Sequence, residues 1–179
     1  MIPGPRGNDK PSMQPPHLPI ETLARVLRLA RLDGMGALVI ATFFALTAAS
    51  IGEIAGATVW LLVAGMGAIE LHGVALLRAG GKRGLNWLIA SQYLLLLVVL
   101  VHCGLRFAHY DPTAMRQAMT PEMRSTLAQA NYEEEDFLRM VYVGTYSAIA
   151  ATMLVYKLCL VRYYHRRRTA IHAAVDGAV

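Results

Sequence analysis

The chain has 179 residues, of which 55% are hydrophobic and only 16% are charged, and its mean hydropathy is +0.40. Soluble domains carry about 25% charged residues, so the composition excludes an ordinary water-soluble domain and indicates lipid around much of the surface. The formal net charge of +5 does not indicate a nucleic-acid partner, because the basic residues flank apolar segments and form no basic face interleaved with aromatic residues.

The first 33 residues differ from the rest of the chain. Residues 1–19 contain six of the eight prolines and show no apolar period, which predicts a disordered cytoplasmic tail. Residues 20–33 form a basic amphipathic helix, either on an anionic membrane surface or as a cytoplasmic extension of the first span. Its apolar face has Ile20, Leu23, Leu27 and Ala30, and its basic face has Arg25, Arg28 and Arg31.

Four long apolar segments follow, over residues 34–52, 57–77, 85–105 and 140–161. Each approaches the ~20 residues that a helix needs to cross a hydrocarbon layer about 30 Å thick. Helices are required because lipid cannot hydrogen-bond to unpaired backbone groups. The predicted fold is therefore all-α, an integral membrane bundle of four transmembrane helices within residues 34–162, followed by a basic cytoplasmic tail over residues 163–179.

The distribution of Lys and Arg predicts the orientation of this bundle. The N-terminal segment, the connection 78–84 and the C-terminal segment are basic, whereas the first connection has no basic residue and residues 106–139 have four against six acids. Basic loops favour the cytoplasmic side, so both termini are expected in the cytoplasm and residues 106–139 outside. The address expected for such a chain is a bacterial inner membrane.

The connection 106–139 is expected to be helical and to carry an acidic cluster. Asp111–Pro112 and Thr120–Pro121 are typical helix starts, each with an N-cap residue followed by proline. The acidic outer cluster is Glu133, Glu134, Glu135 and Asp136. Several carboxylates can bind a divalent cation, but such a run is more often a solvated face. At the C-terminal end of the fourth span, Arg166, Arg167 and Arg168 are expected to face lipid headgroups.

Ionisable groups inside the spans are costly and usually meet a partner or a water-filled cavity. Helix geometry puts Glu70, Gln92 and Lys157 at similar depths in the cytoplasmic half. The favoured interpretation is a buried Glu70–Lys157 pair assisted by Gln92 or Ser91. The alternative is a transport path or catalytic cavity that also includes Tyr146.

No metal or cofactor signature stands out. His72 is turned about 200° from Glu70 around its helix, so the two do not form one chelating face. Haem bound by His72 and His102 is disfavoured because their depths differ by too much. Cys103 and Cys159 lie in apolar segments and are expected as free thiols. No cofactor is therefore assigned.

Small residues recur at four-residue spacing in three of the spans, and such faces let membrane helices approach closely. The predicted packing residues are Ala37, Ala41, Ala45, Ala49, Gly65, Gly73, Gly144 and Ala148. Most of these ladders are expected within the bundle, and one is expected to be left for oligomerisation.

These patterns favour a non-catalytic accessory or assembly subunit that acts through contacts of its helices and outer loop. Its expected partners are the bilayer and other membrane subunits or copies of itself, and no nucleic acid. The alternative is a small oligomeric transporter or channel with a polar intramembrane site around Glu70 and Lys157. A membrane enzyme that uses the same residues is the third and least favoured hypothesis.

Overall fold

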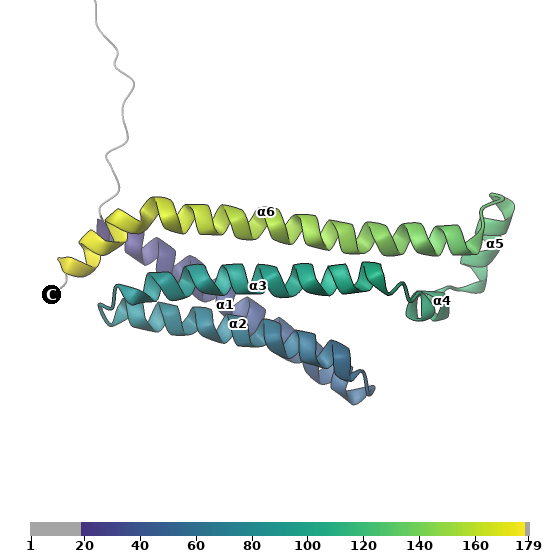
Figure 1. Ribbon diagram of the computed structural model, residues 1–179, viewed down its shortest axis with the longest axis horizontal. Helices are drawn as coiled ribbons and strands as arrows, with labels where there is room; N and C mark the ends of the chain where they lie inside the picture. Colours follow the sequence, from purple (N-terminus) through teal and green to yellow (C-terminus); the bar gives the residue numbers. More distant parts are fainter. Residues whose placement is uncertain (1–18, 178–179) are drawn as a thin grey trace, which may run out of the picture.

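The computed structural model describes residues 19–177, so the predicted tail over residues 1–19 lies outside the described residues except for Pro19. The described residues form helices and turns and contain no strand (Figure 1). The helices are α1 (Pro19–Ser50), α2 (Ile54–Arg78), α3 (Arg83–Ala108), α4 (Thr113–Ala118), α5 (Pro121–Gln129) and α6 (Glu134–Asp176). Helices α1, α2, α3 and α6 are long and apolar enough to cross a membrane, which confirms the predicted all-α class and the number of candidate spans.

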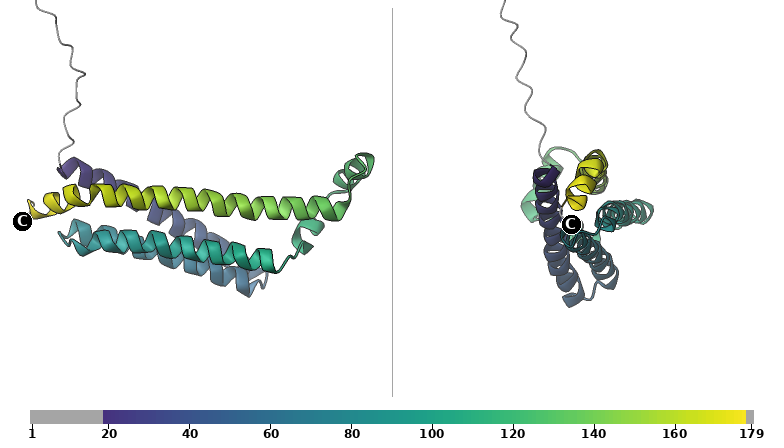
Figure 2. Two further views of the ribbon diagram at one scale, coloured as in Figure 1. Left: turned by 45° about the horizontal axis from the view of Figure 1, so that its top comes forward. Right: turned by 90° about the vertical axis from the view of Figure 1, so that its left-hand side faces the viewer.

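The four long helices run in alternating directions and form one elongated bundle (Figures 1 and 2). The start of α1, the α2–α3 turn and the end of α6 lie at one end of the bundle, called here the terminal end. The α1–α2 turn lies towards the other end, and α4 and α5 lie beyond α3 at that end, called here the loop end. Helix α1 packs along α2, α2 packs along α3, and α6 contacts α3 and α1.

Glycine forms the two short turns that the sequence predicts. Gly52 has a φ of 77° between α1 and α2, and Gly80 has a φ of 79° between α2 and α3. Residues with a Cβ rarely adopt this left-handed conformation, whereas glycine adopts it at little cost. These two positions therefore allow adjacent long helices to reverse direction within a few residues.

The tightly packed core lies at the terminal end. Its residues are Val26, Ala30, Val74, Leu77, Leu85, Leu88, Ile89, Leu160, Val161, Tyr164 and Ile171. Residues 20–33 contribute to this core as the first part of α1, which runs without a break from Pro19 to Ser50. Their buried face contains Thr22, Val26 and Ala30, whereas Ile20 is exposed.

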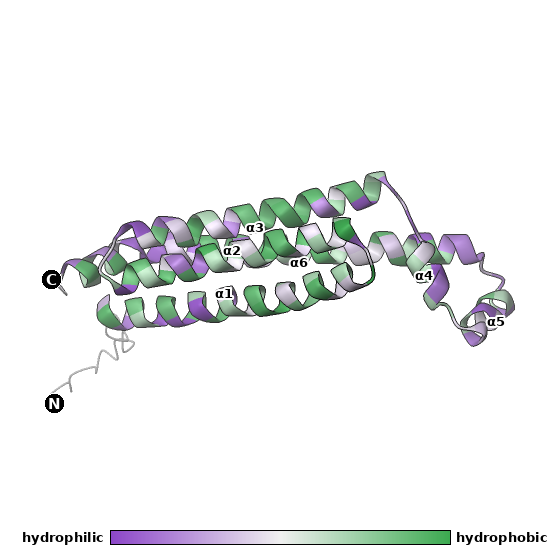
Figure 3. Ribbon diagram, turned by 90° about the horizontal axis from the view of Figure 1, so that it is seen from below, coloured by the Kyte–Doolittle hydropathy of each residue, from purple (hydrophilic) through white to green (hydrophobic). Residues whose placement is uncertain are grey.

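The middle of the bundle exposes large apolar side chains. Val39, Phe43, Leu61 and Val155 are each at least 60% exposed, and Figure 3 shows apolar residues along the long helices and polar residues at both ends. Soluble monomers rarely expose continuous apolar surface on this scale. The exposed surface therefore suggests a multi-pass membrane protein.

The connection between α3 and α6 contains two short helices. Thr120 caps α5, because its side-chain oxygen accepts a hydrogen bond from the backbone N–H of Met123, and Pro121 occupies the first turn as expected. A turn at Asn131, whose φ is 52°, separates α5 from α6. Helix α6 then continues without a break from Glu134 to Asp176, so it also contains most of the predicted basic tail.

Candidate functional site

An ion pair between α1 and α6 lies inside the bundle. The Lys157 ammonium donates a hydrogen bond to Oδ2 of Asp33 over 2.8 Å, and the Tyr156 hydroxyl donates to Oδ1 over 3.0 Å. The side chain of Lys157 is 2% exposed and that of Asp33 is 12% exposed. The prediction that Lys157 pairs with Glu70 is wrong, because α1 continues past the first predicted span and brings Asp33 to the level of Lys157.

Glu70 of α2 lies beside this pair and is 2% exposed. The Tyr164 hydroxyl donates to Oε1 of Glu70 over 3.5 Å. The Glu70 carboxyl interacts electrostatically with Asp33 and Lys157 and lies close to the Gln92 side chain. No ion pair joins Glu70 to Lys157 in the described part of the chain.

Helix α3 adds two polar residues behind Glu70. Ser91 and Gln92 are 1% and 0% exposed. The Ser91 hydroxyl donates to the carbonyl oxygen of Leu88 over 2.8 Å, and Nε2 of Gln92 donates to Oγ of Ser91 over 3.5 Å. Oε1 of Gln92 is buried and accepts no hydrogen bond from any described residue. The site thus contains an acceptor that a bound donor can satisfy.

The residues above form the buried polar cluster, which comprises Asp33, Glu70, Ser91, Gln92 and Lys157 together with the hydroxyls of Tyr156 and Tyr164. Helices α1, α2, α3 and α6 each contribute at least one of these residues. When both carboxyls are ionised, the two carboxylates and one ammonium leave the cluster with one excess negative charge. A charge in an apolar interior is costly without a partner, so one proton or one bound cation would neutralise the cluster.

A close approach of α1 and α2 places the two carboxyls next to each other. A Cβ atom built on Gly67 would lie 2.7 Å from the carbonyl oxygen of Gly34, and a Cβ on Gly34 would lie 3.3 Å from Cβ of Glu70. Only glycine permits this separation of the two backbones, in the way that small residues bring membrane helices together. Asp33 directly precedes Gly34, and Glu70 is one helical turn after Gly67. Both side chains therefore lie at this close contact between α1 and α2.

A second close approach joins α2 to α3. A Cβ on Gly84 would lie 2.6 Å from the carbonyl oxygen of Gly73, so Gly73 is a packing residue. Ala41, Ala45 and Ala64 are also buried.

Other members of the predicted ladders lie on open surface. A Cβ on Gly65 or on Gly144 would meet no atom within 4 Å. Ala49 and Ala148 are exposed. Ala37 differs from them, because it is partly buried and its Cβ lies 3.3 Å from a Cβ built on Gly67 of α2. The described residues thus leave one ladder of α6 without a neighbour, and nothing in the structure shows what covers it.

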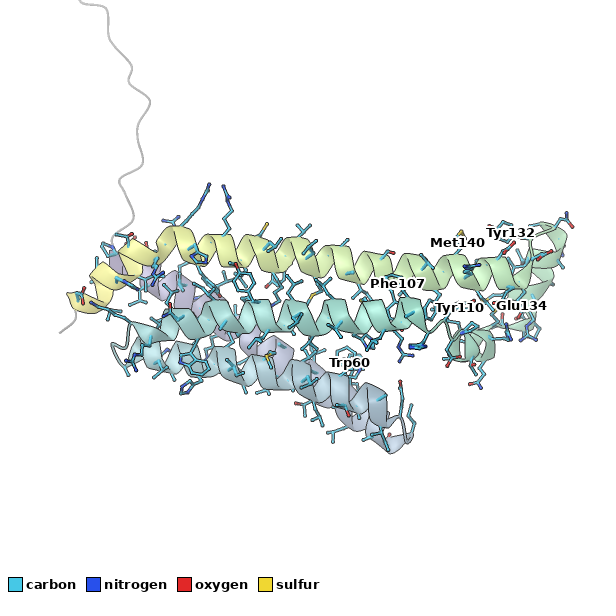
Figure 4. All side chains as sticks on the ribbon, viewed as in Figure 1. Trp60, Phe107, Tyr110, Tyr132, Glu134 and Met140 are labelled. Atoms are coloured by element: carbon cyan, nitrogen blue, oxygen red, sulfur yellow. The ribbon has the colours of Figure 1, made fainter. Side chains whose placement is uncertain are left out.

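Two cavities lie along the bundle, and the first of them borders the buried polar cluster. The first, called here the α1–α6 groove, has a volume of about 510 Å³ and is lined by residues that include Asp33, Tyr156 and Lys157. The second has a volume of about 330 Å³, and its lining includes Tyr146, His102, and the Glu53–Arg106 ion pair, whose atoms are 3.2 Å apart. Both cavities are lined by Trp60 and Val63, so they adjoin each other. Figure 4 shows Trp60 on α2, between the two ends of the bundle.

Tyr146 therefore belongs to the second cavity and not to the buried polar cluster. Its ring lies 4.8 Å from that of Tyr142 and 6.1 Å from that of His102. His72 instead packs edge-on against Trp87, with 5.6 Å between the ring centroids. Within residues 19–177, no three His, Cys, Asp or Glu side chains are grouped as a metal site.

The acidic outer cluster is paired with arginines of the two short helices. Arg116 of α4 forms ion pairs with Glu134 and Glu135, and Arg124 of α5 lies 3.8 Å from Glu134. Figure 4 shows Glu134 at the first turn of α6, near Tyr110 and Tyr132. Two of the four acids thus connect α4 and α5 to α6. At the terminal end, the guanidinium of Arg167 lies over the Tyr163 ring at 5.9 Å, and Arg166 and Arg168 are exposed.

The sequence analysis missed Asp33, Tyr156 and Tyr164 of the site. Asp33 lies at the boundary between the amphipathic segment and the first apolar segment, next to a series of arginines, and looks there like part of a polar flank. The signal that identifies Asp33 is its position directly before the first apolar segment. Lys157 lies near the same end of the fourth segment, so the two side chains can meet between the helices.

No family model, no curated protein and no solved structure matches this chain, so its function has to be argued from the residues of the site.

Proposed function

We propose that the chain is a small membrane transporter and that the buried polar cluster is its cation-binding or proton-binding site. The observation that carries this proposal is the meeting of Asp33, Glu70 and Lys157 from three different helices inside an apolar bundle. Charged residues at such depth mark ion and proton pathways in many membrane proteins. A purely structural ion pair would need one carboxylate, whereas this site has two.

The composition of the cluster supports a site that alternates between an occupied and an empty state. One bound positive charge neutralises the excess carboxylate, and the unpaired Oε1 of Gln92 can accept a hydrogen bond from a bound donor. In a low-dielectric interior the two charge states differ strongly in free energy. Binding and release of one cation can therefore be coupled to a rearrangement of the helices around it.

The two adjoining cavities support an access route along the bundle. The second cavity has the Glu53–Arg106 pair in its lining, and the α1–α6 groove reaches Asp33 and Lys157. Trp60 and Val63 line both cavities. Movement of these two shared side chains is therefore our proposed route for connecting the cavities.

The proposed setting is a membrane in which the basic terminal end faces the cytoplasm and α4 and α5 lie on the opposite side. Arg166 to Arg168 and the basic α2–α3 turn support this orientation, since basic segments stay on the cytoplasmic side. A bacterial inner membrane is the proposed location. Assembly into an oligomer is part of the proposal, because a single copy exposes much apolar surface on α6.

Proton flux in liposomes tests the proposed function. The purified chain is reconstituted with a pH-sensitive dye inside, and a membrane potential is imposed. We expect flux above that of empty liposomes, lowered by about tenfold or more in Glu70→Gln and Asp33→Asn. Glu122→Gln, which changes an exposed carboxylate of α5, is the matched control and should retain the wild-type flux. Absence of flux, or equal flux in all variants that remain folded, would contradict the proposal.

An accessory or assembly subunit, the function that the sequence favours, is the second candidate. The observation in its favour is the outer part of α6, where Gly144 and Ala148 lie on a face that no described residue covers. Small residues on an open helix face suit close contact with another membrane helix.

Purification from native membranes separates this candidate from the first. A partner that co-purifies in fixed ratio, and is lost in Gly144→Leu but retained in Gly65→Leu, would support a subunit. Both glycines lie where an added Cβ meets no atom within 4 Å, so neither change should disturb the fold of one copy. Recovery of the chain alone from native membranes would count against this second function.

A further inference from the structure

The α1–α6 groove has a charged group towards one side and a longer apolar stretch on the other, since Leu29 and Leu32 line it before Asp33 and the lining of α1 continues to Ala41. Among the described residues that line it, Asp33, Tyr156 and Lys157 are the ones with charged or hydroxyl side chains. The rest of the lining is apolar or aromatic and includes Ile40, Trp60, Leu95 and Met153. Asp33 and Ala41, which both line the groove, are eight residues apart and therefore about 12 Å apart along α1. The groove thus has the length and polarity of an amphipathic molecule.

The charge at the polar side selects the sign of the occupant. Both oxygens of the Asp33 carboxylate already accept one hydrogen bond, from Tyr156 and Lys157. An ionised carboxylate has about four acceptor positions, so Asp33 can still accept from a bound cation. Glu70 does not line the groove, but its carboxyl is within electrostatic range of Asp33 and Lys157. With both carboxyls ionised, the field at the groove comes from two carboxylates and one ammonium, so it favours a cationic head group over an anionic one.

The apolar stretch adds aromatic surface. Trp60 lies in the wall of the groove, and its ring stacks on that of Phe44 with 4.8 Å between the centroids. The groove volume of about 510 Å³ lies in the range of about 300–1,000 Å³ that is usual for small-molecule sites.

Access to the groove is from the apolar surroundings of the helices. Leu32 and Ile40, which both line it, are 66% and 56% exposed. An inorganic ion would have to lose its hydration shell to enter through an apolar surface, which is very costly. An organic cation with a large apolar body can partition there instead. The geometry therefore favours an occupant that is both cationic and lipophilic.

We propose that the α1–α6 groove binds a lipophilic organic cation, with its charge at Asp33 and its apolar body against Trp60 and Met153. This inference rests on the proposed function and names the substrate class of the same site. The occupant competes with the proton for the excess negative charge of the buried polar cluster. A lipid acyl chain, which carries no charge in this region, is the other occupant that an apolar groove can hold, and the test distinguishes the two.

Trp60 provides a direct optical report of binding. The chain has two tryptophans, and Trp87 lies away from the groove against His72. In a Trp87→Phe background, only Trp60 fluoresces on selective excitation. The protein is placed in lipid nanodiscs and titrated with tetraphenylphosphonium and, separately, with tetraphenylborate, an anion of the same shape. We expect saturable quenching by the cation and only the unsaturable response of lipid partitioning with the anion.

Two variants and their controls decide the result. Asp33→Asn removes the negative charge at the groove and should weaken binding of tetraphenylphosphonium by about tenfold or more. Gly36→Leu leaves the charged residues in place but fills the groove, since Gly36 lines it and an added Cβ there meets no atom within 4 Å. It should also abolish the saturable quenching. Gly65→Leu, on an open face of α2, and Glu122→Gln should bind as the wild type does.

The proposal is overturned if Gly36→Leu binds the cation as well as Gly65→Leu does, or if tetraphenylborate binds with equal saturation. The second result would indicate an acyl-chain groove without charge selectivity. If Asp33→Asn fails to fold, Gly36→Leu decides alone. Saturable binding without proton flux would contradict the proposed transport and leave the groove site intact. Proton flux without saturable binding of the cation would contradict the groove site and leave the proposed transport intact.

Discussion

The ammonium of Lys157 lies 2.8 Å from a carboxylate oxygen of Asp33, although 124 residues separate them in the chain. This contact joins the first and the last long helix, which meet across the narrow interior of the bundle. Glu70 stands beside it as a second carboxyl without an ammonium of its own. The proposed function and substrate class both depend on this excess of two carboxyls over one ammonium.

Removal of the Lys157 charge should destabilise the fold, because two buried carboxyls would lose their counter-charge. Breaking a buried ion pair from one side costs about 3–5 kcal/mol, so Lys157→Met should lower the free energy of unfolding by several kcal/mol. The double variant Asp33→Asn with Lys157→Met should recover more than half of this loss. Denaturant titration in detergent micelles measures all three proteins. Strictly additive effects of the two substitutions would contradict an energetically coupled pair.

The glycine contact between α1 and α2 predicts a position-dependent effect of alanine. Gly67→Ala puts a Cβ 2.7 Å from the Gly34 carbonyl oxygen, and such overpacking typically costs about 1–3 kcal/mol. Gly65→Ala, two residues away on an open face, should be neutral or stabilise the helix by about 1 kcal/mol or less. Thermal unfolding of the two variants in the same detergent measures the contrast. Equal unfolding temperatures of the two variants would contradict a close contact between α1 and α2 at Gly34 and Gly67.

The long helices could be predicted from the sequence because each requirement acts locally. Apolar length, glycine at the short turns, and Pro121 after the capping Thr120 are properties of adjacent residues, and the structure has all of them. The continuity of α1 could not be decided, because the same amphipathic pattern fits a surface helix and an extension of a span. That ambiguity concealed Asp33, which only a continuous α1 brings to Lys157.

Partner choice inside the bundle depends on the rotation of each helix about its axis. Depth along a helix follows from the sequence, which is why Glu70, Gln92 and Lys157 are predicted at one level of the bundle. Rotation is set by close contacts such as Gly34–Gly67 and Gly73–Gly84, which join different segments. Tyr146 illustrates the same limit, since the sequence groups it with Glu70 and Lys157 whereas the structure has it in the cavity near His102.

The start of α4 should depend on pH through Asp111. The Asp111 pKa is held below its usual value of 3.8, first by a hydrogen bond from the Thr113 hydroxyl and then by one from the Thr113 backbone N–H. Because folding lowers this pKa, Asp111 contributes its full stabilisation of the fold at pH values above the usual pKa of 3.8. This stabilisation is lost as the pH falls through the lower pKa that Asp111 has in the folded protein. Thr113→Val should move the Asp111 pKa back towards 3.8.

Carboxyl carbon chemical shifts in an NMR titration measure this prediction. The backbone N–H of Thr113 remains in the Thr113→Val variant, so a part of the shift should persist. A carboxyl that titrates identically in both proteins would show that the hydroxyl makes no difference. Amide exchange of α4 should increase below the folded pKa, since the first turn loses its side-chain acceptor.

The proposed orientation predicts which residues can be labelled from one side of the membrane. After replacement of Cys103 and Cys159, single cysteines at Lys82 and Asp176 should react from the same side, because these residues form a salt bridge of 2.6 Å. A cysteine at Ser125 of α5 should react only from the other side. Impermeant thiol reagents on intact cells and inverted vesicles give the measurement. Labelling of Ser125 and Lys82 from one side would contradict four crossings.

Proton release on ligand binding tests the central claim most directly, since that claim is that the buried polar cluster holds either a proton or an organic cation. Saturation with tetraphenylphosphonium is followed in weakly buffered nanodisc samples over a series of pH values. We expect the wild type to release protons as the cation binds, up to about one per site at the optimum of the series, and the Glu70→Gln variant to release far fewer. Saturable binding of the cation without proton release at any pH would contradict the claim.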